Sequence, residues 1–127
     1  MSRHLRRGRL AELLRAGAAG LTTDTAAVGL LTDHHHWLTR SEFTTVFITA
    51  ATSPVSGQPL AHVRWQAAIA TLTAGHLPCT PSEAALLRLA ASLAADVPVA
   101  LGDAVVGLDH ASLTAVAEAI MRAGGYR

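Results

Sequence analysis

Three consecutive histidines, in the segment Asp33-His34-His35-His36-Trp37, are the residues with the most evident capacity for chemistry. Imidazoles often bind metal ions, but consecutive residues of a helix point about 100° apart, so three adjacent rings cannot close around one ion. Within this segment, Asp33 and His36 have the spacing that places two ligands on one helical face. Because no His-Glu-x-x-His motif or Cys/His cluster accompanies them, we expect no metal and no cofactor. We expect His34 on an apolar helical stripe, and His35 and His36 in solvent.

The single cysteine, Cys79, is the candidate nucleophile, with His76 three residues upstream. It precedes a helix start at Thr80, where unsatisfied amides and the helix dipole can lower the pKa of a thiol. The alternative is a small apolar residue that fills space beneath the helix entry. We favour that alternative because no family signature surrounds the cysteine and the chain contains no Asn to orient a histidine. Glycine-rich phosphate-binding loops are also missing, so the sequence favours a non-enzymatic function over an enzymatic one.

The basic residues are all arginines, and they are concentrated near the amino terminus. Residues 1–20 have a net charge of +4, whereas residues 21–127 have a net charge of −3. Such a segment can neutralise phosphates of DNA or RNA in a salt-dependent way, although a solvated helix face explains it equally simply. Residues 89–121 contain no Arg, Lys, Asn or Gln to form a recognition helix. The candidate nucleic-acid-binding residues are therefore Arg3, Arg6, Arg7, Arg9 and Arg15.

Apolar residues recur mostly at helical spacing along the chain. Residues 43–51 are ambiguous, because their β-branched side chains suit a strand as well as a helix, and we favour the helix. Capping boxes predict helix starts at Thr39-Arg-Ser-Glu42 and Thr80-Pro-Ser-Glu83. The expected helical segments are 9–18, 24–37, 39–51, 65–75, 83–96, a turn at 102–106, and a last helix from Asp109 to Gly124.

These segments predict a single compact all-α bundle of five to six short helices. We expect residues 1–20 to form a basic helix or arm and residues 21–127 to form the bundle domain. The length of 127 residues permits a core without a disulfide or a metal. Polar residues and prolines interrupt every apolar stretch, which excludes a membrane span, and Glu12 and Arg15 interrupt anything resembling a secretory leader. We therefore expect a cytoplasmic protein.

The helix over residues 83–96 is almost entirely Ala and Leu, apart from one narrow polar stripe. Such a helix is either the centre of the core or part of a protein interface, and the sequence leaves both open. The candidate interface residues are Leu86, Leu87, Leu89 and Leu93. The function predicted from this helix is a non-enzymatic helical interaction module, a small adaptor or accessory subunit that forms a homo-oligomer or joins a larger complex. The alternative is a nucleic-acid-associated regulator that uses the amino-terminal arginines.

The segments 82–95 and 97–109, together with the final helix, are rich in alanine and valine. In this carboxyl-terminal half the chain resembles short Ala-rich proteins of actinobacteria, a group of uncharacterised function. The resemblance implies a stable domain and a GC-rich source. It implies no activity, cofactor, partner or site residue.

Overall fold

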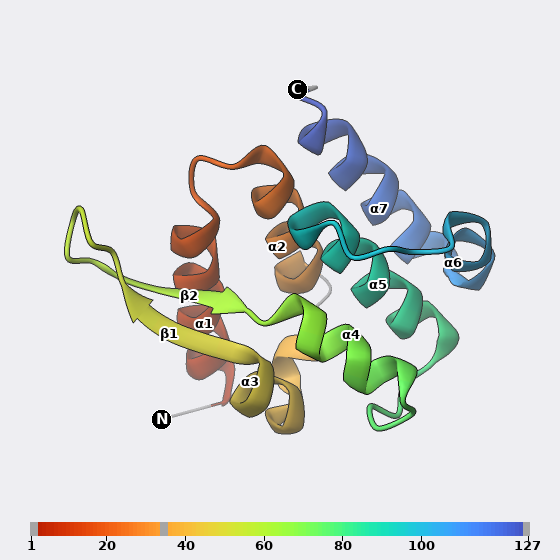
Figure 1. The fold of residues 1–127 in the computed structure, drawn as a ribbon, viewed down its shortest axis with the longest axis horizontal. Coiled ribbons are helices and arrows are strands. Elements are labelled where there is room, and N and C mark those ends of the chain that lie inside the picture. Colours follow the sequence, from red (N-terminus) through yellow and green to blue (C-terminus); the bar gives the residue numbers. More distant parts are fainter. Residues whose placement is uncertain (1–2, 34–35, 126–127) are drawn as a thin grey trace.

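The computed structural model of the protein describes residues 3–33 and 36–125, with side chains from residue 8 onward (Figure 1). Within these ranges the chain forms seven α-helices, one short 3-10 helix (η1) and a two-stranded antiparallel sheet. In chain order the elements are α1 (Arg3–Ala18), α2 (Thr22–Asp33), η1 (Trp37–Thr39), α3 (Ser41–Phe47), β1 (Ile48–Thr52), β2 (Pro59–Val63), α4 (Trp65–Thr73), α5 (Pro81–Ala95), α6 (Leu101–Gly107) and α7 (His110–Ala123). The fold is mostly helical, as predicted, but the hairpin and the number of helices correct the all-α bundle of five to six helices.

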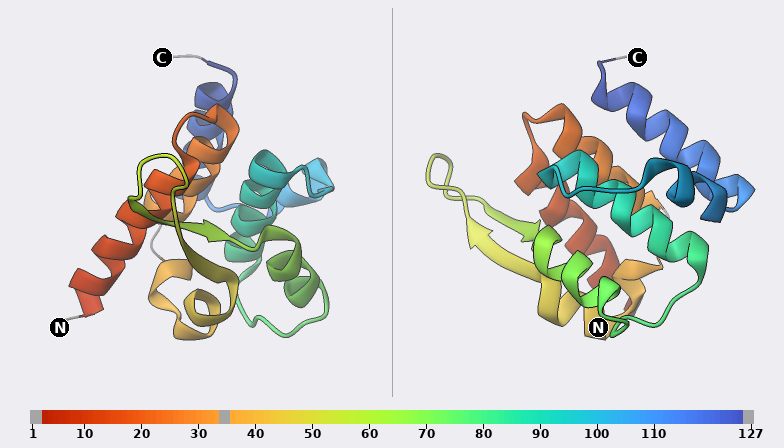
Figure 2. Two further views of the ribbon diagram at one scale, coloured as in Figure 1. Left: turned by 60° about the vertical axis from the view of Figure 1, so that its left-hand side comes forward. Right: turned by 45° about the vertical axis from the view of Figure 1, so that its right-hand side comes forward.

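Helix α5 lies at the centre of the helical part and packs against α2, α4, α6 and α7 (Figure 2). Its start confirms the predicted capping box: the N–H of Glu83 donates to Thr80 Oγ1 (3.2 Å), and the N–H of Thr80 donates to Glu83 Oε1 (2.7 Å). Pro81 occupies the first helical turn, where its missing N–H costs nothing. The helix ends at Asp96, which adopts the left-handed conformation (φ 55°). Both ends of the central helix are therefore set by local sequence.

Helices α1 and α2 pack against each other and are joined at Gly20, which has a positive φ of 91°. The expected boundary between arm and bundle falls at this turn. Leu14 and Ala18 of α1 are nonetheless buried, so the carboxyl-terminal half of α1 is part of the core. Helix α7 begins at the predicted cap, where the N–H of Ser112 donates to Asp109 Oδ1 (2.8 Å).

The segment around α3 differs from its prediction. Arg40 is the N-cap residue, and the Oγ1 hydroxyl of Thr39 donates to the C=O of His36 (2.6 Å) instead of capping α3. The predicted capping box at residues 39–42 is therefore wrong. The helix expected over 43–51 stops at Phe47, and β1 begins at the next residue. Phe47 is the last fully buried side chain before the chain leaves the core, and the β-branched residues beyond it pair with β2.

Candidate interaction surface

The outer edge of β1 carries backbone groups that point away from β2. The strands pair from Ile48 with Val63 through to Thr52 with Pro59. At one end the N–H of Arg64 donates to the C=O of Phe47 (2.7 Å), so these two residues form a hydrogen-bonded pair. Along an antiparallel ladder, hydrogen-bonded pairs alternate with pairs that are not hydrogen-bonded. The peptide groups of Ile48, Ala50 and Thr52 consequently point outward from β1.

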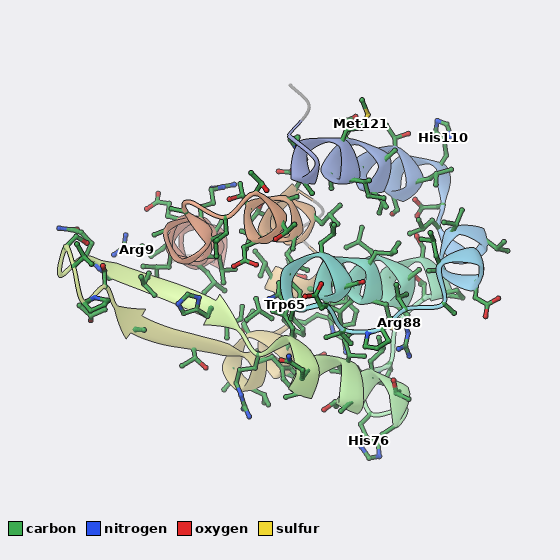
Figure 3. The ribbon with its side chains drawn as sticks, turned by 45° about the horizontal axis from the view of Figure 1, so that its top comes forward. Arg9, Trp65, His76, Arg88, His110 and Met121 are labelled. Carbon is green, nitrogen blue, oxygen red and sulfur yellow. The ribbon has the colours of Figure 1, made fainter. Side chains whose placement is uncertain are left out.

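Helix α1 covers the corresponding edge of β2. The same alternation directs the C=O of Ala61 away from β1. This oxygen lies so close to Gly17 of α1 that a Cβ atom on Gly17 would overlap it. Figure 3 shows β2 between α1 and β1. Among the described residues, no hydrogen bond from another segment reaches the outward peptide groups of Ala50 or Thr52. The hairpin is thus sealed on the β2 side and open on the β1 side.

A cleft of about 700 Å³ opens over one face of the hairpin, between α1 and the segment formed by η1 and α3, and Ala50 of β1 and its cross-strand partner Ala61 of β2 both line it. Its apolar lining includes Leu10, Leu13, Leu38, Ile48 and Ala50. Its polar rim includes Arg9 from α1 and Arg40 next to α3. The cleft therefore combines an apolar floor, charged residues at its margin and an open strand edge.

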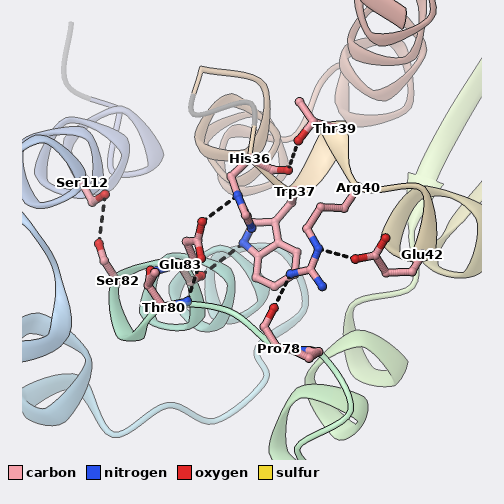
Figure 4. A network of polar contacts seen from close by, with 10 residues as sticks. All are labelled: His36, Trp37, Thr39, Arg40, Glu42, Pro78, Thr80, Ser82, Glu83 and Ser112. Atoms are coloured by element: carbon pink, nitrogen blue, oxygen red, sulfur yellow. Dashed lines mark hydrogen bonds and ion pairs between the residues drawn. The ribbon is translucent and has the colours of Figure 1, made fainter.

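Arg40 holds one wall of this cleft in place (Figure 4). Its Nε donates to Glu42 Oε1 (2.6 Å), and its Nη1 donates to the C=O of Pro78 (2.6 Å). The guanidinium also lies 5.0 Å from the centre of the Trp37 ring, a cation–π distance. A backbone hydrogen bond and the bond from Arg40 lower the pKa of the Glu42 carboxyl. Arg40 and Glu42 therefore neutralise each other as an ion pair at the rim.

The predicted nucleic-acid-binding residues lie along α1. Arg9 and Arg15 are exposed, and Arg9 forms a surface ion pair with Glu12 (3.4 Å). The side chains of Arg3, Arg6 and Arg7 lie outside the part of the chain whose side chains the structure describes. The structure brings Arg9 to the rim of the cleft, a position that the sequence did not indicate.

The predicted interface on α5 is corrected for three of its four leucines. Leu86, Leu87 and Leu89 are 3%, 0% and 5% exposed, because α2, α4, α6 and α7 surround the helix. Leu93 is partly buried. The buried leucines therefore fit the alternative, in which this helix is the centre of the core.

A second polar cluster joins η1 to α5 and α7 (Figure 4). His36 Nδ1 lies 2.6 Å from Glu83 Oε2, and the indole N–H of Trp37 donates to the C=O of Glu83 (3.2 Å). His36 is half-buried, which corrects its expected position in solvent, whereas His34 and His35 lie outside the described residues. No sequence pattern indicated the pairing of His36 with Glu83, because the two residues are far apart in the chain.

The pairing of His36 with Glu83 resembles the histidine and carboxylate of a general base, but among the described side chains no hydroxyl or thiol hydrogen-bonds to the His36 ring. His36 Nε2 is buried and has no partner among the described residues. The neighbouring Oγ of Ser82 donates to Ser112 Oγ (3.3 Å) and accepts from the N–H of Asp109 (3.0 Å). These contacts connect the starts of α5 and α7, so the cluster acts as a structural link.

The environment of Cys79 opposes the nucleophile hypothesis. Burial, together with the nearby Glu83 carboxylate, raises the pKa of the Cys79 thiol. The helix start was expected to lower it, but the N–H of Glu83 already donates to Thr80, and the Glu83 carboxylate adds a negative charge near the thiol. His76 is exposed at the end of α4. The arrangement favours the alternative in which Cys79 is a small apolar residue that fills space beneath the start of α5.

Among the side chains that the structure describes, those of residues 8–33 and 36–125, no three His, Cys, Asp or Glu come together as ligands for a metal ion. None of the helices within residues 3–33 and 36–125 is long and apolar enough to cross a membrane. Comparison of the chain with protein-family models, with curated proteins and with solved structures finds no match. Within the part of the chain that the structure describes, the cleft lined by β1 encloses about 700 Å³ between apolar walls, which is the form of a binding site.

Proposed function

We propose that the protein is a non-enzymatic interaction module that binds a segment of a partner protein in the cleft between α1, α3 and β1. The observation that carries this proposal is the apolar-lined volume of about 700 Å³. A cleft of this size is within the range of small-ligand sites, but its open form and its helix and strand walls suit a peptide segment. A partner that fills it removes apolar surface from water, which is the main driving force of association.

The contacts around the cleft support a preformed binding surface. Phe43 and Phe47 are buried next to Trp37 in a series of ring contacts at 5.2 and 5.6 Å. Arg40 ties the same wall to the loop before α5. Because these side chains are already held in place, a partner loses little free energy in ordering the wall.

The test is selection of random twelve-residue peptides displayed on phage against the immobilised protein. Enriched peptides are synthesised, and their affinities are measured by fluorescence anisotropy. Thr45 lines the cleft and Thr49 does not, and both side chains are exposed. We expect Thr45→Glu to weaken binding at least about tenfold, which corresponds to 1.4 kcal/mol, and Thr49→Glu to leave it unchanged. A failure to enrich any peptide, or equal binding by both variants, would overturn the proposal.

Nucleic-acid binding is the second candidate function. It is favoured by one observation: α1 is helical from Arg3 onward, so all five arginines belong to one helix. The test is gel retardation of a 20-base-pair duplex at two salt concentrations. If this function is correct, replacing Arg6, Arg7 and Arg9 with Ala abolishes a salt-sensitive shift and leaves the circular dichroism spectrum unchanged. Retardation by the triple variant would exclude these residues as the binding surface.

A further inference from the structure

The open edge of β1 determines how a partner segment can lie in the cleft. Ala50 and Thr52 each present an N–H and a C=O outward, and those groups match the hydrogen-bonding pattern of an additional strand. Side chains alternate along a strand, and Ile48 and Ala50 line the cleft. A strand added to this edge therefore directs every second side chain toward the same cleft.

Nothing in β1 protects this edge from pairing. Proteins commonly block free edges with charged residues, prolines or bulges. The β1 sequence Ile-Thr-Ala-Ala-Thr contains no charge and no proline, and its register with β2 is continuous from Ile48 to Thr52. The edge of β2, in contrast, is covered by α1 and includes Pro59, which has no N–H to offer. The hairpin has one edge suited to a further strand.

The charges at the cleft indicate the composition of that strand. The cleft is lined by Arg9, Arg40 and Glu42, of which Arg40 and Glu42 pair with each other. Arg9 interacts with Glu12 at 3.4 Å, and the two side chains are 58% and 67% exposed, so this pair is weak and replaceable. Helix α1, Arg9 and Glu12 included, carries five arginines and one glutamate, a net charge of +4. A carboxylate on the incoming segment complements this field.

We infer that the partner of this protein supplies an extended acidic segment, which adds as a third strand to the free edge of β1. Its cleft-facing residues, every second one, are mostly apolar, and an Asp or Glu at one of these cleft-facing positions pairs with Arg9, which lines the cleft. This inference rests on the proposed function, because it specifies the occupant of the same cleft. Main-chain hydrogen bonds provide affinity in this mode, and the cleft provides specificity.

The first test uses the peptides selected on phage, with Ala50→Pro as the variant. Proline at position 50 removes an outward N–H and keeps the ladder of the hairpin, because this pair is not hydrogen-bonded within it. We expect affinity to fall at least about tenfold. As a measurement that needs no variant, the amides of Ala50 and Thr52 should become protected from hydrogen exchange when the peptide binds. Unchanged exchange with retained binding would overturn strand addition and leave the proposed function standing.

The second test addresses the face and the charge of the bound segment. Ala50→Glu, which adds bulk and a negative charge on the cleft face, should weaken peptide binding, and Ala51→Glu, on the opposite face of the same strand, should not. Arg9→Gln should reduce affinity about two- to fivefold, and Arg15→Gln, exposed on α1 outside the cleft, should leave it unchanged. Enriched peptides should carry Asp or Glu, and their binding should weaken with salt. Peptides without acidic residues, bound equally by the Arg9 and Arg15 variants, would overturn the acidic partner.

Discussion

Gly17 in α1 and Ala61 in β2 are in direct contact through their backbones. A Cβ atom on Gly17 would overlap the carbonyl oxygen of Ala61, so the helix approaches the strand more closely than any other residue allows. The Ala61 oxygen points away from β1, and the contact therefore holds α1 on the outer edge of β2. It also leaves the other edge of the hairpin, on β1, open to a partner.

Replacing Gly17 with Ala should destabilise the protein. Overpacking costs about 1–3 kcal/mol, and the better helix propensity of Ala returns about 1 kcal/mol. We expect a net loss of up to about 2 kcal/mol in the free energy of unfolding, measured by urea denaturation. Gly8 is the control, because it lies in the same helix with nothing near its Cβ position. Gly8→Ala should stabilise by up to about 1 kcal/mol, and stabilisation by both substitutions would contradict the close contact.

Substitution of Leu87 separates a core role from an interface role for α5. This side chain is fully buried, so Leu87→Ala should cost about 2–5 kcal/mol of unfolding free energy. Leu87→Glu should unfold the chain, as seen by circular dichroism. Val106→Ala, at a position that is 87% exposed, should change stability by less than about 0.5 kcal/mol. A folded Leu87→Glu protein that only changes its oligomeric state would restore the interface interpretation.

The thiol of Cys79 should react slowly in the folded protein. Burial and the Glu83 carboxylate raise its pKa, so at pH 8 a smaller fraction is the reactive thiolate than in the unfolded chain. Alkylation by iodoacetamide, followed by mass spectrometry, should be slower in buffer than in urea. Glu83→Gln removes the negative charge and should speed the reaction in the folded state. A native rate above the unfolded rate would revive the nucleophile hypothesis.

The capping box at α5 can be compared with the hydroxyl at residue 39. Thr80→Ala removes the acceptor for the N–H of Glu83 and should cost about 1 kcal/mol in thermal or urea unfolding. Thr80→Ser keeps the acceptor and should retain most of the stability. Thr39→Ala removes a donor to the C=O of His36 rather than a helix cap, so its cost should be smaller. A larger loss at Thr39 than at Thr80 would contradict this assignment.

Sequence patterns were sufficient where neighbouring residues set the structure. The starts of α5 and α7 depend on a side chain and an amide three residues apart, and both caps were predicted. The loop over residues 53–58 also has a local cause, because the N–H groups of Val55 and Ser56 donate to Ser53 Oγ. At residues 39–42 the same pattern failed, because Arg40 takes the N-cap position and draws Glu42 into an ion pair.

The sequence by itself determined that the chain is mostly helical and that its apolar residues suffice for a core, because helical periodicity and capping are local properties. The tertiary structure decided the remaining features. It paired Ile48–Thr52 with Pro59–Val63, buried Leu86, Leu87 and Leu89 at the centre, and joined His36 to Glu83. Each of these depends on contacts between segments distant in the chain. The open edge of β1 has the same origin, because only the docking of α1 determines which strand remains uncovered.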